Sequence, residues 1–137
     1  MSEPGTHSHL HARLLAEMRS RFAPEDDLCI LVDDASLPAD QRPHAIGGKV
    51  PDVYIRSVAS SRVTALGEAK TATDVDNGHT RLQLAAYFEF LKHQPSPYLV
   101  LAVPWHRSRL MAGIAAKIQV QCQASNVTVI VFENLPG

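Results

Sequence analysis

The chain has 137 residues, of which 45% are hydrophobic and 20% charged, a composition typical of one globular domain with a buried core. Lysine and arginine number 13 against 14 aspartates and glutamates, a net charge of −1, which excludes a globally basic surface, so that any contact with nucleic acid needs a local basic patch. The sequence lacks both an apolar run of about 20 residues and a secretory signal, and we therefore expect a cytoplasmic protein without membrane contact and with Cys29 and Cys122 as free thiols.

The first 70 residues predict one helix followed by three strands. Leu10, Leu14 and Met18 recur at helical spacing until a proline at position 24, which predicts an amphipathic helix over residues 8–22 after a flexible tail at 1–7. Apolar runs and alternation then predict three strands, and prolines and glycines indicate a long loop between the first two. The strands cover residues 28–32, 53–58 and 62–70, and the loop covers residues 35–51.

The second half of the chain alternates helices with apolar strands. A polar loop at residues 71–79 precedes the first of these helices, and both strands are nearly continuous apolar runs, as in strands buried on both faces. The predicted elements are a helix at 80–93, a strand at 98–103, a helix at 105–124 and a strand at 127–132. This order predicts a single α/β domain over residues 8–137, whose mixed sheet begins with an antiparallel meander and continues with crossover units.

Charged residues gather where the second and third strands would pair. A three-residue turn at 59–61 would place Asp52 opposite Glu68, with their Cβ atoms about 4.5–5.5 Å apart. Lys70 would lie on the same face, because strand residues alternate in direction. This register brings two carboxylates and an ammonium group to one end of the sheet. If the pairing were shifted by one residue, Asp52 would point to the opposite face from Glu68, and the match would be accidental.

The same register places Arg56 opposite Thr64 and Tyr54 opposite Leu66. The other face of the third strand carries small residues, which would let a helix pack closely against it. These residues are Val63, Ala65, Gly67 and Ala69.

Two opposed carboxylates repel each other unless a cation lies between them. Mg²⁺ prefers oxygen ligands and is commonly held by one or two carboxylates together with water and substrate phosphate, and Mn²⁺ is the alternative ion. The backbone carbonyl of Ala69 lies between Glu68 and Lys70 and could add a further oxygen ligand. The Lys70 ammonium could orient or deprotonate a water, or neutralise charge that builds up on a phosphate.

The segment Pro51-Asp52, followed by Glu68-Ala69-Lys70, resembles the PD-(D/E)xK nuclease superfamily, which includes restriction endonucleases and Holliday-junction resolvases. In the following helix, Gln83 and Tyr87 are similar to the QxxxY motif of the RecB-type exonuclease branch. The predicted element order is also that of the restriction-endonuclease-like αβββαβ core. The resemblance covers residues 8–104 and leaves the last helix and strand outside.

The resemblance implies a Mg²⁺-dependent nuclease that hydrolyses phosphodiester bonds in DNA. Asp52 and Glu68 would bind the metal ion, and Lys70 would act on the attacking water. Gln83 and Tyr87 would position Lys70, the water or a DNA phosphate. Many members of the family add an acidic residue from the first helix. In this sequence Glu17 is the acidic residue of the predicted helix and takes that metal-binding role.

Several of these residues also have ordinary structural explanations. Thr80 and Gln83 have the spacing of a capping box, in which Gln83 would bond back to the start of its helix. Glu17 could instead form a surface ion pair with Arg21. Tyr87 could be a half-buried packing residue. The whole domain could also be a catalytically inactive DNA-binding or scaffold member of the same fold.

The residues between 92 and 132 include no acidic side chain, which gives this segment a local basic bias. Arg107 and Arg109 from this segment, together with Arg81, could contact DNA phosphates; the alternative is an ordinary solvated helix face. Trp105 fits packing better than a base-stacking platform. A homodimer would give so small a nuclease a second cutting site by symmetry.

Overall fold

The computed structural model describes residues 3–22, 27–60 and 62–134, with side chains described from residue 9 onward. Its elements follow the predicted order, and the predicted α/β class with a mixed sheet is confirmed. In chain order they are α1 (Glu3–Phe22), β1 (Leu28–Val32), the short 3₁₀ helix η1 (Ala39–Gln41), β2 (Val53–Ser57), β3 (Val63–Ala69), α2 (Gly78–Leu91), β4 (Tyr98–Pro104), α3 (Ser108–Gln121) and β5 (Thr128–Asn134).

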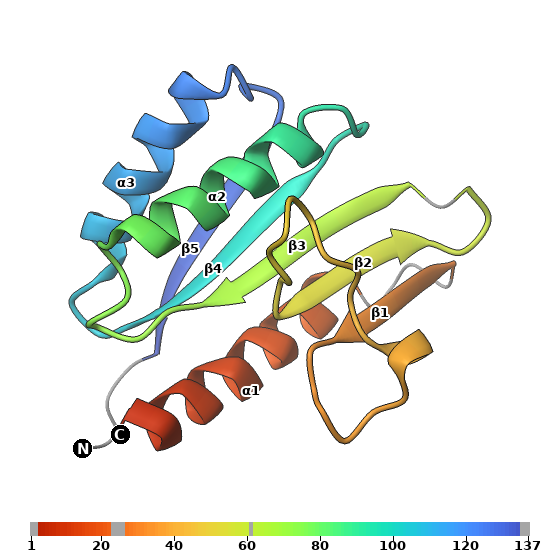
Figure 1. The fold of residues 1–137 in the computed structure, drawn as a ribbon, viewed down its shortest axis with the longest axis horizontal. Helices are drawn as coiled ribbons and strands as arrows, with labels where there is room; N and C mark the ends of the chain where they lie inside the picture. Colours follow the sequence, from red (N-terminus) through yellow and green to blue (C-terminus); the bar gives the residue numbers. More distant parts are fainter. Residues whose placement is uncertain (1–2, 23–26, 61, 135–137) are drawn as a thin grey trace.

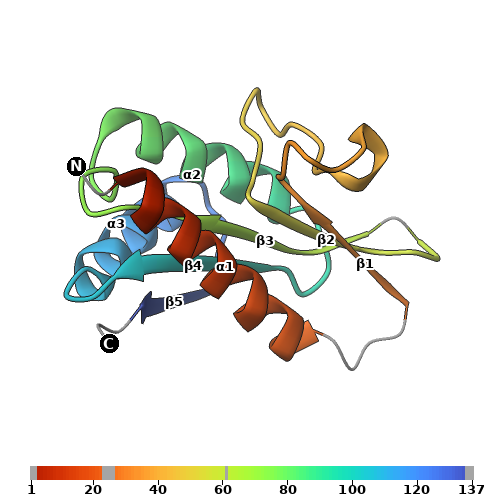
Figure 2. The same cartoon turned by 90° about the horizontal axis from the view of Figure 1, so that it is seen from below.

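The five strands form one open sheet in the order β1-β2-β3-β4-β5 (Figure 1). β1, β2 and β3 pair antiparallel, whereas β3, β4 and β5 pair parallel. Parallel neighbours need a long crossover connection, which α2 and α3 supply. The two helices cover one face of the sheet and α1 covers the other (Figure 2), so the molecule has three layers.

α1 packs directly against the centre of the sheet. Leu10, Leu14 and Met18 are fully buried against the sheet. At Gly67 an added Cβ would overlap Met18 Sδ. A glycine in β3 therefore lets α1 pack closely, as the small residues of this face predict. Gly67 faces α1, and Glu68, the next residue, faces α2.

The predicted hairpin register is confirmed for the pairs next to the charged residues. Tyr54 pairs with Leu66, and the adjacent pairs follow in step. The register then shifts between Ile55 and Arg56, where Arg56 pairs with Val63 and not with Thr64. A β-bulge of this kind turns the following side chains to the other face. Val63, predicted to share the face of Ala65, therefore lies on the opposite face and packs in the core under α2.

Several predicted boundaries are wrong by a few residues. α1 begins at Glu3, so residues 3–7 continue the helix where a flexible tail was predicted, and residues 1–2 lie outside the described part. A proline at position 4 is tolerated there because the first helical turn does not use its N–H group. α2 begins at Gly78, because Asn77 and not Thr80 caps it. α3 begins at Ser108, three residues later than predicted.

Cys29 and Cys122 are free cysteines, as predicted. Among the described residues, none of the helices has the length and apolar character needed to cross a membrane.

Candidate active site

The predicted charged cluster forms where β2 begins and β3 ends. Asp52 immediately precedes β2, and Glu68 and Lys70 lie at the end of β3. The Ala69 N–H group donates a hydrogen bond of 2.8 Å to Asp52 Oδ2, which fixes the Asp52 carboxylate beside the third strand. All three ionisable side chains are buried, with 7%, 4% and 7% of Asp52, Glu68 and Lys70 exposed. Such burial is rare for charged side chains and needs compensating partners.

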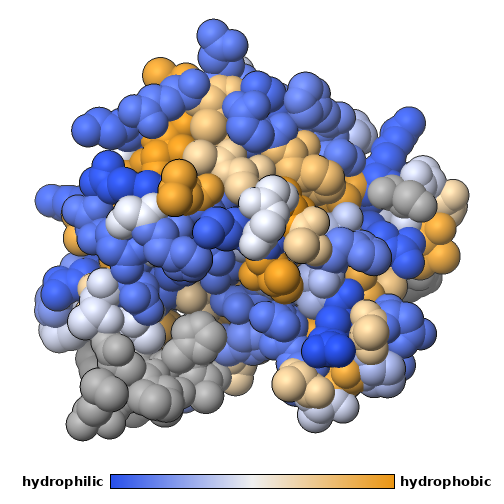
Figure 3. All heavy atoms as spheres, in the orientation of Figure 1, coloured by the Kyte–Doolittle hydropathy of each residue, from blue (hydrophilic) through white to orange (hydrophobic). Residues whose placement is uncertain are grey.

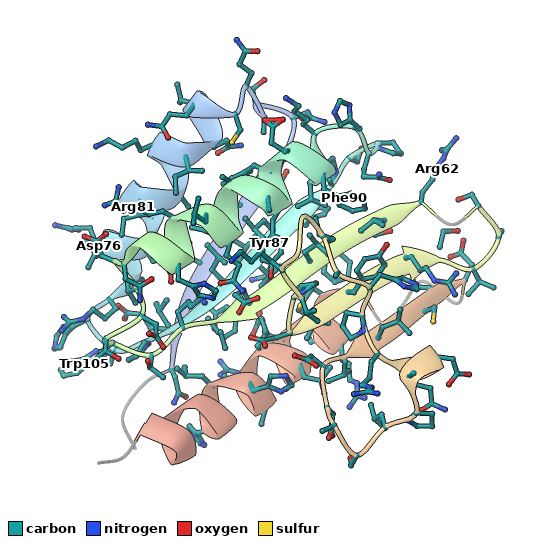
Figure 4. The ribbon with its side chains drawn as sticks, in the orientation of Figure 1. Arg62, Asp76, Arg81, Tyr87, Phe90 and Trp105 are labelled. Carbon is teal, nitrogen blue, oxygen red and sulfur yellow. The ribbon has the colours of Figure 1, made fainter. Side chains whose placement is uncertain are left out.

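Both oxygens of the Glu68 carboxylate are engaged. The Lys70 ammonium lies 3.6 Å from Oε2, and the Tyr87 hydroxyl donates a 3.1 Å hydrogen bond to Oε1. Gln83 Nε2 in turn donates to the Tyr87 hydroxyl at 3.1 Å. Two side chains from α2 therefore reach across to the end of β3 and hold its carboxylate in place (Figure 4, where Tyr87 is labelled).

The start of α2 explains why Gln83 is free to reach the cluster. The Asn77 side chain accepts a 2.8 Å hydrogen bond from the Thr80 N–H group, and the Thr80 hydroxyl donates to the carbonyl of Asp74. The capping box proposed for Thr80 and Gln83 is therefore wrong. Gln83 and Tyr87 lie four residues apart on one helix face, and both are buried toward the sheet.

Burial and mutual repulsion dominate the electrostatics of the cluster. Removal from water raises the pKa of Glu68 well above its ordinary value, and the negative charge of Asp52 raises it further, whereas Lys70 and the Tyr87 hydrogen bond oppose the shift. Burial and the charge of Glu68 also raise the pKa of Tyr87, so its hydroxyl stays a neutral donor. Two carboxylates face one ammonium group here, and a cation would balance the remaining negative charge.

One buried polar atom in the cluster lacks a partner. Among the described residues, Gln83 Oε1 accepts no hydrogen bond although the side chain is only 6% exposed. An unsatisfied buried acceptor costs about 1–3 kcal/mol. A water held in the cluster would satisfy this oxygen.

The donor set fits a hard divalent cation. Asp52 and Glu68 supply carboxylate oxygens on one face, and the Ala69 carbonyl belongs to the same stretch of β3. Within the described residues there is no group of three or more histidine, cysteine, aspartate or glutamate side chains that could hold a metal ion. A two-carboxylate site completed by water and substrate oxygens is the usual arrangement for Mg²⁺.

The structure does not place Glu17 with this cluster. Its carboxylate lies 2.9 Å from Arg21 Nε and 3.7 Å from Arg13 Nη1, along the surface of α1. α1 packs on the face of the sheet opposite to α2, whereas Glu68 points toward α2. The surface ion pair, the alternative for Glu17, is therefore what the structure shows.

The predicted phosphate-binding arginines lie around the first turns of α2 and α3. Arg81 is held by Asp76, with Nη2 and Nε at 2.6 and 3.0 Å from one carboxylate oxygen. Arg81, Arg109 and Lys117 line a hollow of about 250 Å³ between the two helices. Figure 3 shows hydrophilic side chains around the rim of this face, with apolar atoms exposed between them. Arg107 is exposed beside them.

Sequence reasoning did not single out His79. Lys49 Nζ lies 3.5 Å from His79 Nδ1, which joins the loop before β2 to the first turn of α2. His79, Gln83 and Tyr87 are spaced at i, i+4 and i+8 and so follow one face of the helix. This spacing is visible in the sequence and could have indicated that His79 lies at the outer end of the row that reaches Glu68.

No family model matches the chain, and searches of curated proteins and of solved structures return no match. Its function must therefore be inferred from the residues of the cluster.

Proposed function

We propose that this protein is a Mg²⁺-dependent nuclease with a restriction-endonuclease-like core that hydrolyses phosphodiester bonds in DNA. The observation that supports this proposal best is the meeting of Asp52, Glu68 and Lys70, all buried, at one end of the sheet. The element order of the chain up to β4 is also that of the family core. The sequence motif and the buried carboxylate–lysine cluster thus both support metal-assisted phosphodiester hydrolysis.

Asp52 and Glu68 would hold the divalent cation, with the Ala69 carbonyl beside them. When bound, such an ion polarises a phosphoryl oxygen and lowers the pKa of water. Mg²⁺ sites that act on phosphates keep coordination positions open for water and for the substrate phosphate. Two carboxylates fill only part of the coordination shell of Mg²⁺, so such positions would stay open here.

Lys70 would act on the attacking water. Its ammonium is buried within 3.6 Å of Glu68, so it stays near the reacting phosphate and can neutralise charge that develops there. Gln83 Oε1 can accept a hydrogen bond from the same water and orient it. Tyr87 acts through Glu68, because its hydroxyl fixes the carboxylate that Lys70 also contacts.

Cations outside the cluster would hold the DNA backbone. Lys49 lies at the outer end of the helix face that carries Gln83, in contact with His79, and Arg107 and Arg109 lie at the start of α3. Contacts of this kind position a strand through its phosphates and carry little sequence information. We therefore expect weak sequence preference.

The direct test is cleavage of plasmid and linear DNA with Mg²⁺, Mn²⁺ or EDTA. We expect cleavage with either ion and none with EDTA. Glu68→Gln and Lys70→Ala should each lower the rate at least 100-fold, since each removes a group of the reacting cluster. Glu89→Gln, an exposed acid-to-amide change on α2, is the matched control and should cleave as the unchanged protein does. Equal cleavage by Glu68→Gln would refute the proposal.

One observation favours a second candidate, an inactive DNA-binding member of the same fold. Tyr87 and Lys70 already engage both oxygens of Glu68, as in a purely structural network. Such a protein would bind DNA equally well with and without Mg²⁺ and would cleave under neither condition. Melting temperatures that do not change with added Mg²⁺ or Mn²⁺ would support this candidate over the nuclease.

A further inference from the structure

The turn between β4 and α3 exposes two aromatic rings that lie against each other at a tilt. Trp105 is the one tryptophan of the sequence, and 47% of it is exposed. Its ring lies against that of His106, with centroids 3.3 Å apart and an interplanar angle of 41°. The predicted packing role therefore accounts for only part of this side chain, because nearly half of it faces solvent.

This pair lies at the same end of the sheet as the candidate active site. β4 runs parallel to β3 with Ala102 beside Ala69, and the Lys70 N–H group donates to the Ala102 carbonyl at 3.0 Å. Trp105 follows Ala102 by three residues, which places it about 10 Å further along the neighbouring strand direction. In Figure 4 Trp105 lies at this end of the sheet and Arg62 at the other.

Hydrogen bonds from β5 brace the turn that carries the rings. His106 adopts a left-handed backbone with φ of 72°, which is uncommon for a residue other than glycine. Glu133 at the end of β5 fixes the turn, since its Oε2 accepts hydrogen bonds from Ser108 N and Oγ at 3.1 and 2.8 Å. The backbone of His106 also donates to this carboxylate. An uncommon backbone held this firmly beside a candidate site indicates a preorganised surface.

Positive charge accompanies the exposed ring. Arg109 follows Trp105 by four residues and lines the hollow that also contains Arg81 and Lys117. Asp76 lines the same hollow and pairs with Arg81, so among the described residues Arg109 and Lys117 supply its unpaired positive charge. An aromatic face beside a row of cations is the combination that binds single-stranded nucleic acid, because the ring stacks on a base while the cations follow the phosphates. In a duplex the faces of the bases are covered by their neighbours, so the ring can stack only on a base that is unpaired or at an end.

We propose that Trp105, supported by His106, stacks on an unpaired base of a DNA strand whose phosphate lies at the Asp52–Glu68–Lys70 cluster. The substrate is then single-stranded DNA or a duplex with a single-stranded end, and a closed duplex binds less well. This inference names the substrate form of the proposed nuclease site and rests on that proposal for the position of the cleaved bond. The stacking itself can be tested without cleavage.

The fluorescence of the chain reports on Trp105 alone among tryptophans, which makes the test direct. The full chain is titrated in EDTA with a single-stranded oligo(dT), with a hairpin duplex whose ends are both closed, and with inorganic polyphosphate. We expect saturable quenching by oligo(dT), and less than one third of that quenching by the other two at equal phosphate concentration. No quenching by oligo(dT), or equal quenching by polyphosphate, would overturn the inference.

Variants separate stacking from folding and from charge. Trp105→Ala should weaken the binding of fluorescently labelled oligo(dT) about tenfold, and Trp105→Phe, which keeps an aromatic face, should recover most of that loss. Arg62→Ala, at the opposite end of the sheet, should bind as the unchanged protein does, and circular dichroism confirms that each variant is folded. Unchanged binding by Trp105→Ala would overturn the inference.

The two proposals fail in distinguishable ways. If Trp105→Ala loses oligo(dT) binding but the unchanged protein cleaves no DNA with Mg²⁺, the stacking surface stands and the nuclease proposal fails. If the unchanged protein cleaves DNA and Trp105→Ala binds oligo(dT) equally well, the nuclease proposal stands and the stacking surface is refuted.

Discussion

At the scale of single residues, the strongest constraint in this protein is a buried carboxylate that costs free energy to ionise. Glu68 lies beside Asp52 in a buried site, and both its burial and that neighbouring charge raise its pKa above the ordinary 4.5. The folded state therefore binds the Glu68 proton more tightly than the unfolded chain does. Without a divalent cation, the contribution of this residue to stability falls as the pH rises from about 4.5 through its raised folded pKa.

This linkage predicts a pH-dependent difference between the protein and Glu68→Gln. Measured in EDTA, the melting temperature of the variant relative to the unchanged protein should increase as the pH rises from 4.5 to 8, because the variant carries no proton to lose at this position. Each unit by which the folded pKa exceeds the unfolded one is worth about 1.4 kcal/mol. A difference in melting temperature that stays constant over this range would contradict the assignment of a raised pKa to Glu68.

Tyr87 offers a second test at this scale. Tyr87→Phe leaves Glu68 Oε1 and Gln83 Nε2 without their partner in a buried site, so we expect a loss of about 1–3 kcal/mol in the free energy of unfolding. Urea denaturation measures it. Tyr98→Phe, the same change in a half-buried tyrosine packed edge-on against Phe22, should cost less than 1 kcal/mol. Equal effects of the two changes would mean that the Tyr87 hydroxyl is not essential to the cluster.

Sequence reasoning could identify Asp52, Glu68 and Lys70 because the alternation of strands fixes which side chains share a face. It could not choose between the two roles open to Glu17, because helical periodicity shows which residues of α1 face the sheet but not which face of the sheet the helix covers. Gly67 decides that question, and its contact with Met18 exists only in three dimensions.

At the scale of elements, the first turn of α2 and the loop before β2 together form the outer end of the site. The contact between Lys49 Nζ and His79 Nδ1 joins them, and neither side chain has an acidic partner within ion-pair distance in the described ranges. The order of the elements could be predicted from periodicity, but this contact could not. Asn77 caps α2, and a bulge around Thr64 shifts the pairing register of β2 and β3. Both features depend on local backbone geometry that hydrophobic patterns do not encode.

We predict that Lys49 contacts a DNA phosphate where the loop before β2 meets the first turn of α2. Lys49→Met should weaken DNA binding and reduce the slope of log affinity against log salt concentration by about 0.7–0.9, the value for one lost phosphate contact. Lys49→Arg keeps the charge and should preserve the slope. Fluorescence anisotropy of labelled DNA over a range of salt concentrations measures both. If Lys49→Met kept the full slope, Lys49 would not contact the DNA backbone.

At the scale of the whole molecule, one face of the sheet packs against an apolar core and the other carries the candidate site. Among the described residues, α1 closes one face with an apolar core that includes the Ala69 side chain but none of the charged side chains of the candidate site, whereas the other face carries α2, α3 and the charged cluster at its end. The sequence predicts that one face of β3 is small and apolar and that the other ends in charge, but it does not show which helix covers which face. The small residues of β3 predict a closely packed helix, but the contact between Met18 and Gly67 identifies that helix as α1 only in the structure.

Gly67→Ala tests this division directly. The added methyl group would overlap Met18 and push α1 away from the sheet, and overpacking of this kind costs about 1–3 kcal/mol. We expect a lower urea midpoint, whereas the rate of DNA cleavage by the folded protein at low temperature should stay within about twofold. A loss of cleavage in fully folded Gly67→Ala would show that the two faces are coupled.

The central claim is that Asp52 and Glu68 hold a divalent cation beside Lys70. Crystals grown with Mn²⁺ and measured at its absorption edge would show the ion by its anomalous scattering. We predict one strong peak in contact with carboxylate oxygens of both Asp52 and Glu68, and no such peak in crystals of Glu68→Gln. A peak elsewhere in the molecule, or none at saturating Mn²⁺, would contradict the claim.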